Sequence, residues 1–348
     1  MKDSSSHSYS VKDVASLAGV SVGTVSNVLN RPNLVSAAKR TRVLAAIEEL
    51  GFVRNESARS LRSGTSRTVG LLVLDIRNPF FTDVAAGAEA TSEDHGHSVL
   101  LANSAESSIR EGAYLDLFEE QRVQGILITP VTDVLDRLDR MRSRGIPAVL
   151  VDRLAASDRF CSVSVDDAAG GRLAVNHLAD MGYHRIAFVG GPATLQQVTD
   201  RYNGATEAAR LRGLDDIRLF ETADLSFHRG RQIGDTIADL RPEIRPDAIF
   251  AANDLVALGL LQSFIAHNIR VPEDIALIGF DDIDFASQSS IPLSSIRQPR
   301  ELIGRRAAEL LFEEIGASGP HVHHQDVFSP ELVVRRSTLP VTENSVLA

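Results

Sequence analysis

The sequence predicts an N-terminal all-α helix-turn-helix head and an α/β body made of two doubly wound halves. Three observations predict this fold class. Residues 11–30 have the apolar spacing of two short helices broken at Gly19. From residue 68 onward, short apolar runs alternate with helical segments, which is the pattern of a parallel sheet covered by helices. This alternation occurs twice, and 348 residues are enough for two or three domains.

The head begins with two helices whose ends are marked by turn and cap residues. Ser10 is a good N-cap, and Asp13 three residues later approximates a capping box. Gly19 can adopt the positive φ that a tight turn needs, and Ser21 can cap the second helix. A small core is expected between Val14, Ala15 and Val20 on one side and Val25, Val28 and Leu29 on the other. In this motif the second helix can lie in the major groove of DNA, although any small helical hairpin shows similar spacing.

A third helix and a linker complete the N-terminal part. Ser36 is expected to cap a helix that ends near Leu50, before Gly51. Residues 55–62 form a short amphipathic segment that is too short to be a stable helix alone, so it should become ordered on DNA or against a second copy of itself. Residues 63–66 have the composition of a flexible linker.

Charge is divided unevenly along the chain. Residues 1–64 hold nine Lys and Arg against five Asp and Glu, a net charge of +4, whereas the remainder carries −14. A basic head on an acidic body is what a nucleic-acid reader with a separate sensing body should show. The overall charge of −10 therefore does not argue against DNA.

Composition also indicates the compartment. No run of 18 apolar residues exists, and the polar start lacks the apolar core of a signal peptide, so we expect a cytoplasmic protein that spans no membrane. Cys161 is the only cysteine, which excludes an intrachain disulfide. We interpret it as a small buried apolar residue rather than as a reactive thiol.

The body is expected to contain two series of strands, with helices between them. The first series is 69–74, 99–101, 125–128 and 148–151, and the second is 186–189, 219–220, 248–251 and 275–279. Ligands of open α/β sheets bind beyond the carboxyl ends of the strands. The residues expected at those ends are Asp75, Thr129, Asp152, 190–192, Asn253 and Asp281.

Ordered motifs along nearly the whole chain resemble the LacI/GalR family of bacterial transcription regulators. They are D-V-A-x-x-A-G-V-S-x-x-T-V-S-x-V-L-N at 13–30, V-S at 35–36, A-I-E-E-L-G-F at 46–52, the segment 55–61, D-I-R-N-P-F-F at 75–81, V-D-R at 151–153, G-Y-H-R-I-A-F-V-G-G-P at 182–192, N-D at 253–254, G-F-D-D-I at 279–283 and P-E-L-V-V-R at 330–335. They extend over about 325 residues, so coincidence is implausible.

The resemblance implies a body like the type I periplasmic sugar-binding proteins, in which the chain crosses three times between the halves. The expected domains are a DNA-binding head at 1–54, a hinge helix with linker at 55–64, an N-subdomain at 65–165 with 295–325, a C-subdomain at 166–294 with 326–340, and a tail at 341–348. The tail has no heptads, so a tetramer built on a C-terminal coiled coil is not expected.

The resemblance also assigns DNA contacts. Base-reading positions are Val22, Gly23 and Asn27, and backbone contacts are expected from Ser21, Thr24, Ser26 and Asn30. Many relatives carry arginine where this chain has Asn27. Arginine favours guanine and asparagine favours adenine, so this base of the half-site should differ from the common operator, unless Asn27 only touches a phosphate.

Family members insert a hinge leucine into the minor groove, and the residues that match this hinge are Asn55, Ala58, Arg59 and Leu61. An apolar wedge costs a few kcal/mol of unstacking and gives a bent duplex with more protein contact. Ordinary hinge packing is the alternative for Leu61. Two adjacent hinge helices require a homodimer, and its two-fold symmetry implies an inverted-repeat operator.

The effector contacts implied by the resemblance are Phe80, Phe81, Asp152, Arg201, Asn253 and Asp281. Weaker candidates are Asp75, Asn78, Thr129, Arg153 and Asp166; Asn78 is also a helix start and Arg153 a partner for a carboxylate. Carboxylates, amides and an aromatic face suit a sugar. Leu195 and Gln197 occupy positions where purine-responsive members carry polar contacts, which makes a nucleobase less favoured.

Other classes of function are weakly supported. No G-x-G-x-x-G or P-loop motif appears, no acid/base pair is identifiable, and neither an enzyme nor a cofactor is expected. A secreted sugar receptor would need a signal peptide. His321, His323 and His324 have no acidic or cysteine partner at ligand spacing, so we interpret them as solvated loop histidines and expect no metal.

The sequence therefore predicts a homodimeric, sequence-specific DNA-binding regulator, a repressor, controlled by a small molecule such as a sugar in the cleft of the body. The alternative is a corepressed or activating member that responds to a nucleobase, a sugar phosphate or a protein partner.

Overall fold

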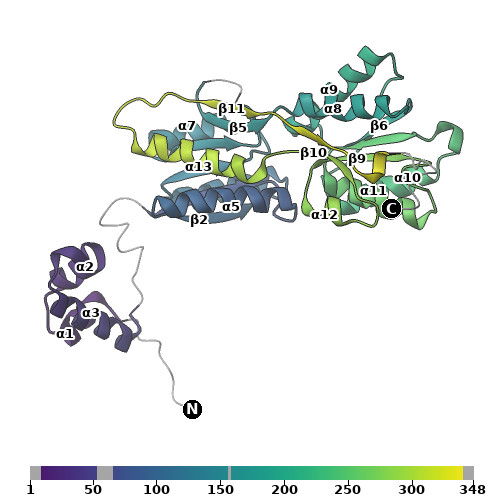
Figure 1. The fold of residues 1–348 in the computed structure, drawn as a ribbon. Coiled ribbons are helices and arrows are strands. Elements are labelled where there is room, and N and C mark those ends of the chain that lie inside the picture. The colour runs from purple at the N-terminus through teal and green to yellow at the C-terminus, as the bar shows by residue number, and fades with distance from the viewer. Residues whose placement is uncertain (1–8, 53–65, 156–157, 340–348) are drawn as a thin grey trace. The chain divides into compact units, whose positions relative to one another are not determined.

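The computed structural model describes residues 9–52, 66–155 and 158–339. The chain divides into two compact units, Met1–Ser66 and Arg67–Ala348, which correspond to the head and the body. Figure 1 labels their helices and strands. In the described residues, no helix is both long and apolar enough to cross a membrane.

The head is helical, as the sequence predicts. Its elements are α1 (Val11–Ala18), α2 (Val22–Asn30), the 3₁₀ helix η1 (Pro32–Leu34) and α3 (Ala37–Leu50). Gly19 ends α1 with φ 61°, and Gly51 ends α3 with φ 57°, so both helices stop at a left-handed residue. The Asp13 carboxylate accepts from the Ser10 N–H at 2.7 Å and from its hydroxyl at 2.8 Å. The buried core joins all three helices through Val14, Ala15, Ala18, Val25, Val28, Val43 and Ala46, with Phe52.

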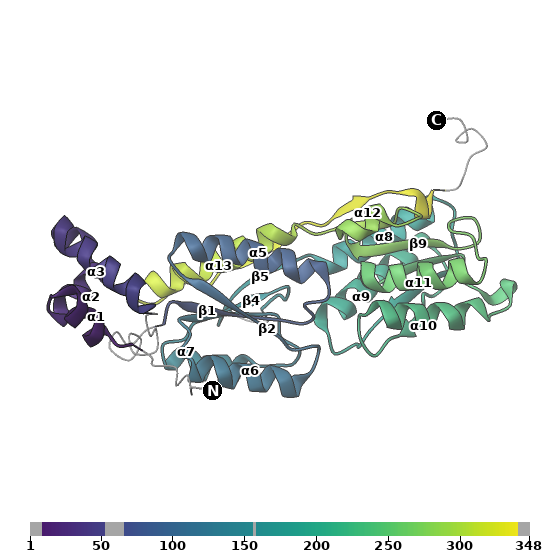
Figure 2. The same ribbon diagram turned by 90° about the horizontal axis from the view of Figure 1, so that it is seen from below.

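The first half of the body is a parallel sheet with helices on both faces. In sheet order its strands are β11 (Gln325–Phe328), β5 (Cys161–Val165), β4 (Ala148–Val151), β3 (Gly125–Ile128), β1 (Thr68–Val73) and β2 (Ser98–Asn103). One face packs against α5 (Pro79–Asp94) and α13 (Arg300–Gly316), and the other against α6 (Ser108–Glu120) and α7 (Leu135–Ser143). Figure 2 shows these two helical layers on opposite sides of the strands.

The second half repeats this plan, with one antiparallel edge strand. Its strands, in sheet order, are β12 (Glu331–Val333), β10 (Ser294–Arg297), β9 (Ala276–Asp281), β8 (Ala248–Ala251), β6 (Ile186–Gly190) and β7 (Arg218–Glu221). The helices α8 (Asp167–Asp180) and α9 (Gln196–Arg212) cover one face, and α10 (Phe227–Ala238) and α11 (Asp254–Ala266) cover the other. A short helix, α12 (Asp284–Gln288), follows β9.

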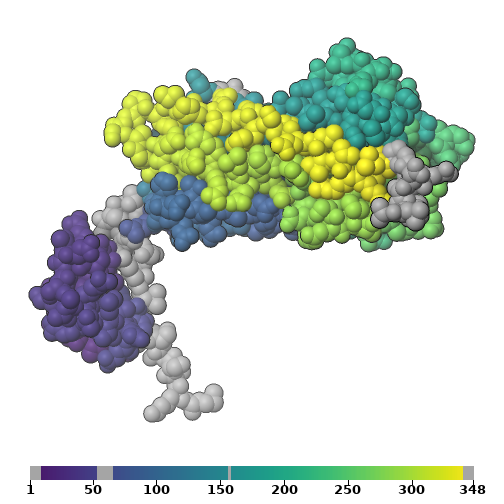
Figure 3. Space-filling view, in the orientation of Figure 1, coloured from purple at the N-terminus to yellow at the C-terminus, as the bar shows by residue number. Residues whose placement is uncertain are grey.

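The crossings between halves differ slightly from the expected positions near 295 and 325. Strand β10 pairs with β9 in the second sheet, and β11 pairs with β5 in the first, so each crossing lies a few residues later along the chain. Figure 3 shows the C-terminal segment running along the body across both halves. The sequence prediction missed β5, β10, β11 and β12, because their serine and other polar residues interrupt the continuous apolar runs that identify most of the other strands.

Candidate functional site

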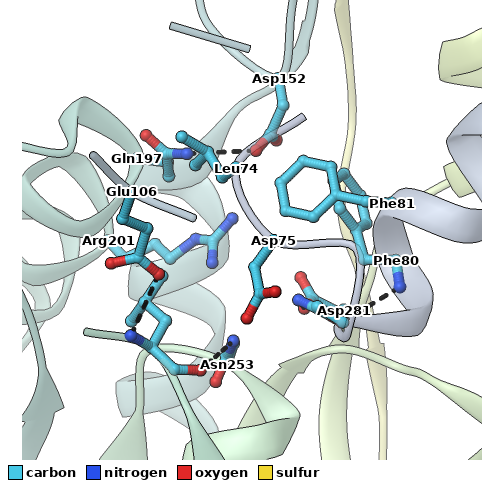
Figure 4. A pocket seen from close by; sticks show the side chains of 12 residues that line it. Leu74, Asp75, Phe80, Phe81, Glu106, Asp152, Gln197, Arg201, Asn253 and Asp281 are labelled. Atoms are coloured by element: carbon cyan, nitrogen blue, oxygen red, sulfur yellow. Dashed lines mark hydrogen bonds between the residues drawn. The ribbon is translucent and has the colours of Figure 1, made fainter. Parts of the chain in front are cut away.

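A cavity lies between the two halves of the body, at the carboxyl ends of their central strands (Figure 4). Its lining atoms surround about 380 Å³ of space, a volume that includes open solvent. The lining residues are Leu74, Asp75, Asn78, Phe80, Phe81, Glu106, Asp152, Gln197, Arg201, Leu225, Asn253 and Asp281. This is where ligands of open α/β sheets bind.

Asp152 follows β4 and presents one free carboxylate oxygen. Its backbone has φ 55°, a left-handed conformation that costs a residue of this type on the order of 1–3 kcal/mol. Gln197 Nε2 donates to Asp152 Oδ2 at 3.2 Å, whereas Oδ1 is buried without a hydrogen-bond partner among the described residues. Burial, reinforced by the neighbouring Asp167 carboxylate, raises the pKa of Asp152 well above its ordinary value.

Glu106 lies three residues beyond β2 and presents a second free oxygen. Its Oε1 accepts from the Leu225 N–H at 3.3 Å, and its Oε2 is buried with no partner in the described part of the chain. Burial raises the pKa of Glu106 to about 7. The strand-end pattern did not single out Glu106, because the prediction did not consider the end of the second strand.

Asp281, the last residue of β9, connects the two halves. Asn78 Nδ2, from the first half, donates to Asp281 Oδ2 at 3.0 Å, and Gln298 Nε2 donates to Oδ1 at 2.8 Å. Burial raises the pKa of the Asp281 carboxyl. Asn78 also accepts from the Phe80 N–H at 3.1 Å and so caps α5, which means that it is both a helix start and a pocket residue.

Arg201 supplies the buried cation of the pocket. Its Nε donates to Asp167 Oδ1 at 2.7 Å, and its Nη1 donates to the Ala252 carbonyl at 2.7 Å. The guanidinium carbon also lies 3.6 Å from the ring centroid of Phe280. Burial raises the pKa of Asp167 to about 6, although Arg201 lowers it. These contacts fix the side chain in one place, which suits a residue that orients a ligand.

The remaining walls are aromatic and amide groups. Phe80 and Phe81 are buried and meet edge to face, with ring centroids 4.9 Å apart. Asn253 caps α11 by accepting from the Val256 N–H at 2.9 Å, and it donates to the Leu225 carbonyl at 3.2 Å. Figure 4 shows Phe81, Arg201 and the acidic side chains arranged around one space. An apolar face among hydrogen-bonding groups is a common arrangement for small polar ligands.

The head presents a second surface, on α2. Val22, Gly23 and Asn27 are exposed there, as base-reading residues must be, and Thr24 and Ser26 are half-buried. Ser21 accepts from the Thr24 N–H at 3.1 Å, which confirms its capping role. Asn30 Nδ2 donates to the Ser26 carbonyl at 2.8 Å. Ser21 also stands in a Gly-x-Ser-x-Gly stretch, but between two helices rather than at the strand-to-helix turn that makes this pattern a hydrolase nucleophile.

Comparisons with known proteins decide the family. A family profile for bacterial regulatory proteins of the lacI family matches residues 10–55, and one for a periplasmic binding protein-like domain matches residues 175–338. The HTH-type transcriptional repressor PurR of Photobacterium profundum is 33% identical over 330 residues, which cover 94% of this chain and 98% of that protein. The chain belongs to the LacI family. It is a DNA-binding transcriptional regulator with an effector-binding body.

Other LacI-family members support the same assignment. The HTH-type transcriptional repressor CytR of Escherichia coli K12 is 33% identical, over 94% of this chain and 96% of that protein. The lac repressor dimer bound to operator and the anti-inducer ONPF has a TM-score of 0.79 at 27% identity, over 95% and 99% of the two chains. The regulator CelR in complex with cellobiose has a TM-score of 0.69 at 31% identity, over 94% and 99%.

The LacI-family resemblance named six effector residues, and the structure places all six around the cavity, together with Asp75 and Asn78. Asp75 is engaged with the side chain of Arg77, whose Nε donates to it at 2.9 Å. Gln197 also lines the cavity. The sequence indicates only that it stands where purine-responsive family members carry polar contacts. Leu74 and Leu225 complete the wall without having been predicted.

Three weaker candidates do not line the cavity. Thr129 is buried beside β3, with no partner for its hydroxyl within the described residues. Arg153 donates to the Thr132 carbonyl at 3.1 Å, rather than to a carboxylate. Asp166 caps α8 by accepting from the Ala169 N–H at 2.7 Å. The strand-end pattern predicts which residues lie near the end of a strand, but it does not predict the direction in which each side chain points.

Two predictions about other residues have different outcomes. The hinge residues Asn55, Ala58, Arg59 and Leu61 lie outside the described residues, so their predicted roles stay predictions. The interpretation of His321 and His323 as solvated is wrong, because both are half-buried. His321 Nε2 lies 3.3 Å from the sulfur of Cys161, a partner 160 residues away that spacing along the sequence did not reveal.

Proposed function

We propose that this chain is a repressor that binds an inverted-repeat operator as a homodimer and is controlled by a neutral sugar in the cavity between its two halves. One observation carries the choice of ligand: Asp152 Oδ1 and Glu106 Oε2 are buried acceptors without a partner among the described residues. A buried acceptor left unsatisfied costs about 1–3 kcal/mol, so a ligand that donates to both gains that amount.

The balance of hydrogen-bonding groups favours hydroxyls. Four carboxylates line the cavity, from Asp75, Glu106, Asp152 and Asp281, against the single guanidinium of Arg201. Carboxyl groups with raised pKa values accept hydrogen bonds from O–H groups and, when protonated, also donate to them. With only one guanidinium among them, a neutral polyol fits better than a sugar phosphate. The apolar C–H face of a sugar has a matching surface in Phe81.

Two classes of ligand have support: sugars from the relatives, and nucleobases from a residue of the cavity. The regulator CelR was solved in complex with cellobiose, and a LacI-family regulator of Enterococcus faecium was solved with bound ribose. Gln197, at a position where purine-responsive family members carry polar contacts, also lines the cavity. A nucleobase is therefore the second candidate, and a ligand panel must include it.

Control of DNA binding requires that the ligand favours one arrangement of the two halves. The Asn78–Asp281 hydrogen bond joins the halves at the cavity wall, so a ligand that contacts Asp281 and Phe81 alters the balance between open and closed forms. A coupling free energy of about 1–3 kcal/mol would change operator affinity by about 5- to 150-fold.

An apolar surface on the second half supports the homodimer. Phe227, Ile265 and Phe285, from α10, α11 and α12, are all exposed and line one hollow together with Leu255, Leu258 and Leu261. A contiguous exposed apolar surface is typical of a subunit interface. We infer that a second copy of the chain covers this surface. Ile265→Asp should therefore convert the dimer into a monomer, which analytical sedimentation would detect.

The proposed DNA contacts follow from exposure on α2. Val22, Gly23 and Asn27 would meet base edges, and Ser21, Thr24, Ser26 and Asn30 would meet the backbone, with the hinge residues in the minor groove. As a DNA-binding regulator, the protein would act in the cytoplasm, where the bacterial chromosome is.

Thermal unfolding against a panel of sugars, sugar phosphates and nucleobases tests the ligand, and each hit is then tested in operator binding at fixed salt. A true effector at about 100 times its Kd adds about 2.7 kcal/mol of stability. Asp152→Asn should abolish the stabilisation by the sugar. Asp166→Asn is the matched control, because asparagine also caps α8 and the residue lies outside the cavity.

The outcomes separate the candidates. A sugar that stabilises the protein and releases DNA supports an inducible repressor, and one that tightens DNA binding supports a corepressed member. Stabilisation by a nucleobase alone contradicts the sugar proposal. An effect of Asp152→Asn equal to that of Asp166→Asn contradicts the assignment of the cavity as the effector site.

A further inference from the structure

Four metal-ligating side chains meet at the amino-terminal edge of the first sheet, away from the effector cavity. Cys161 is the first residue of β5, Glu314 lies in the last turn of α13, and His321 and His323 lie in the connection from α13 to β11. One ligand atom from each of these four residues lies within 4.8 Å of all the others. No role in DNA or effector binding requires this combination.

The distances fit one ion. Cys161 Sγ lies 3.3 Å from His321 Nε2 and 3.6 Å from His323 Nδ1. Sulfur and nitrogen ligands of tetrahedral zinc, at about 2.3 Å and 2.0 Å from the metal, lie about 3.5 Å from one another. The side chains therefore already have the separation of neighbouring corners of a zinc site.

Glu314 provides the independent sign of a missing partner. Its Oε2 is buried and accepts no hydrogen bond within the part of the chain that the structure describes. A carboxylate oxygen without a donor inside a protein is unfavourable, unless a cation satisfies it. Glu314 belongs to the same group of four potential ligand residues as Cys161, His321 and His323.

We propose that Cys161, His321, His323 and Glu314 bind one zinc ion. Thiolate, imidazole and carboxylate are the zinc ligands of proteins, and four of them make a closed structural site rather than a catalytic one. The ion would join the start of β5, the end of α13 and the loop before β11, and so stabilise the first half of the body. Strand β1 begins at the same edge, at the point where the chain enters the body.

Arg142 contacts one of the proposed ligands, and its position must change when zinc binds. Its Nη1 lies 3.0 Å from His323 Nε2, which therefore accepts, so the ring proton is on Nδ1. Zinc bound at Nδ1 requires the proton on Nε2, and the guanidinium then turns away from the ring. It keeps its bonds to the Arg159 carbonyl and to Asp139, which lies 2.7 Å from Nη2.

The test uses the full chain without an affinity tag, freed of metal by chelation and kept reduced. Cobalt(II) and zinc(II) are titrated in competition with a chromophoric chelator. We expect one equivalent per chain, with the visible spectrum of tetrahedral cobalt and a thiolate-to-cobalt charge-transfer band. Zinc should also raise the midpoint of thermal unfolding.

Variants identify the ligands. Cys161→Ser, His321→Ala and His323→Ala should each weaken zinc binding by about 100-fold or more, since loss of even an outer-shell partner costs about 10- to 100-fold. Cys161→Ser should also lose the charge-transfer band. His184→Ala is the matched control, because His184 is an exposed histidine in the other half. His324→Ala tests whether the exposed third histidine of the loop takes part.

Unfolding midpoints measured without metal show whether each variant is folded. A near-wild-type midpoint together with lost zinc stabilisation supports the site. Absence of stoichiometric binding in the wild type overturns it, and so does binding that survives Cys161→Ser and His321→Ala. In that case Cys161 is only a thiol in hydrogen-bonding contact with His321, and the four side chains do not form a metal site.

Discussion

Asn78 and Asp281, 203 residues apart, meet across the cavity between the two halves of the body through one hydrogen bond of 3.0 Å. Asn78 belongs to the first half of the body and Asp281 to the second, so this bond forms only when the halves are close together at the cavity. Because Asn78 also caps α5, one side chain connects the start of a helix to the relative position of the two halves.

Asn78→Ser separates these two roles. Serine is a good N-cap, so α5 should keep its start, but its short side chain cannot reach Asp281. We expect effector affinity to fall by about 10-fold, since a hydrogen bond to a charged group contributes about 1.5–3 kcal/mol. The free energy of unfolding should fall by no more than that amount, because α5 keeps its cap. Isothermal titration with the effector found in the panel measures the affinity; unchanged affinity would show that the bond has no part in closure.

Glu106 predicts a pH dependence of stability. Its folded pKa of about 7 exceeds the ordinary value of 4.5, so its contribution is fully present below pH 4.5 and is lost as the pH rises through 7. Glu106→Gln removes this loss. The free energy of unfolding of the variant, relative to wild type, should rise by roughly 2 kcal/mol between pH 5 and pH 8, less than full linkage because Glu106 is only partly buried.

Urea denaturation without effector at the two pH values makes this measurement. Asp274→Asn is a useful comparison, because Arg270 donates to its carboxylate and lowers the pKa of Asp274. That variant should show no such gain towards pH 8. A pH-independent difference between wild type and Glu106→Gln would mean that Glu106 is ionised throughout.

Arg201 and Asp167 form a buried ion pair 2.7 Å long, with side chains 3% and 8% exposed. Arg201→Met leaves the Asp167 carboxylate without its cation, so unfolding free energy should fall by about 3–5 kcal/mol at neutral pH. The loss should shrink below pH 6, where Asp167 becomes protonated. Adding Asp167→Leu should restore much of the stability, and a double variant no more stable than Arg201→Met would contradict this explanation.

Asn27 predicts the operator. Site selection with the wild type should favour adenine opposite this residue, and Asn27→Arg should favour guanine, with about 1–3 kcal/mol of discrimination. Asn33→Arg adds the same charge at an exposed position of the head outside α2, and should tighten binding without changing the preferred base. Selection of the same guanine by wild type and Asn27→Arg would show that Asn27 does not read this base.

Local patterns were sufficient for much of the architecture. Ser10, Gly19 and Ser21 act through neighbours within a few residues, so the sequence alone predicts the two helices and their turn. Continuous apolar runs identify the central strands, because those strands are buried on both faces. Once parallel strands are predicted, polar residues at their ends are expected at one edge, which is why Asp152 and Asp281 were found.

Tertiary packing decided the rest, because it depends on residues far apart in the chain. Only the structure shows that Glu106 lines the cavity, whereas Arg153 lies outside it and donates to the Thr132 carbonyl. Cys161 lies 3.3 Å from His321 only because β11, near the end of the chain, pairs with β5. Sequence spacing therefore determined that this protein is a LacI-family regulator, whereas the pairing of strands from distant parts of the chain decided which side chains share a site.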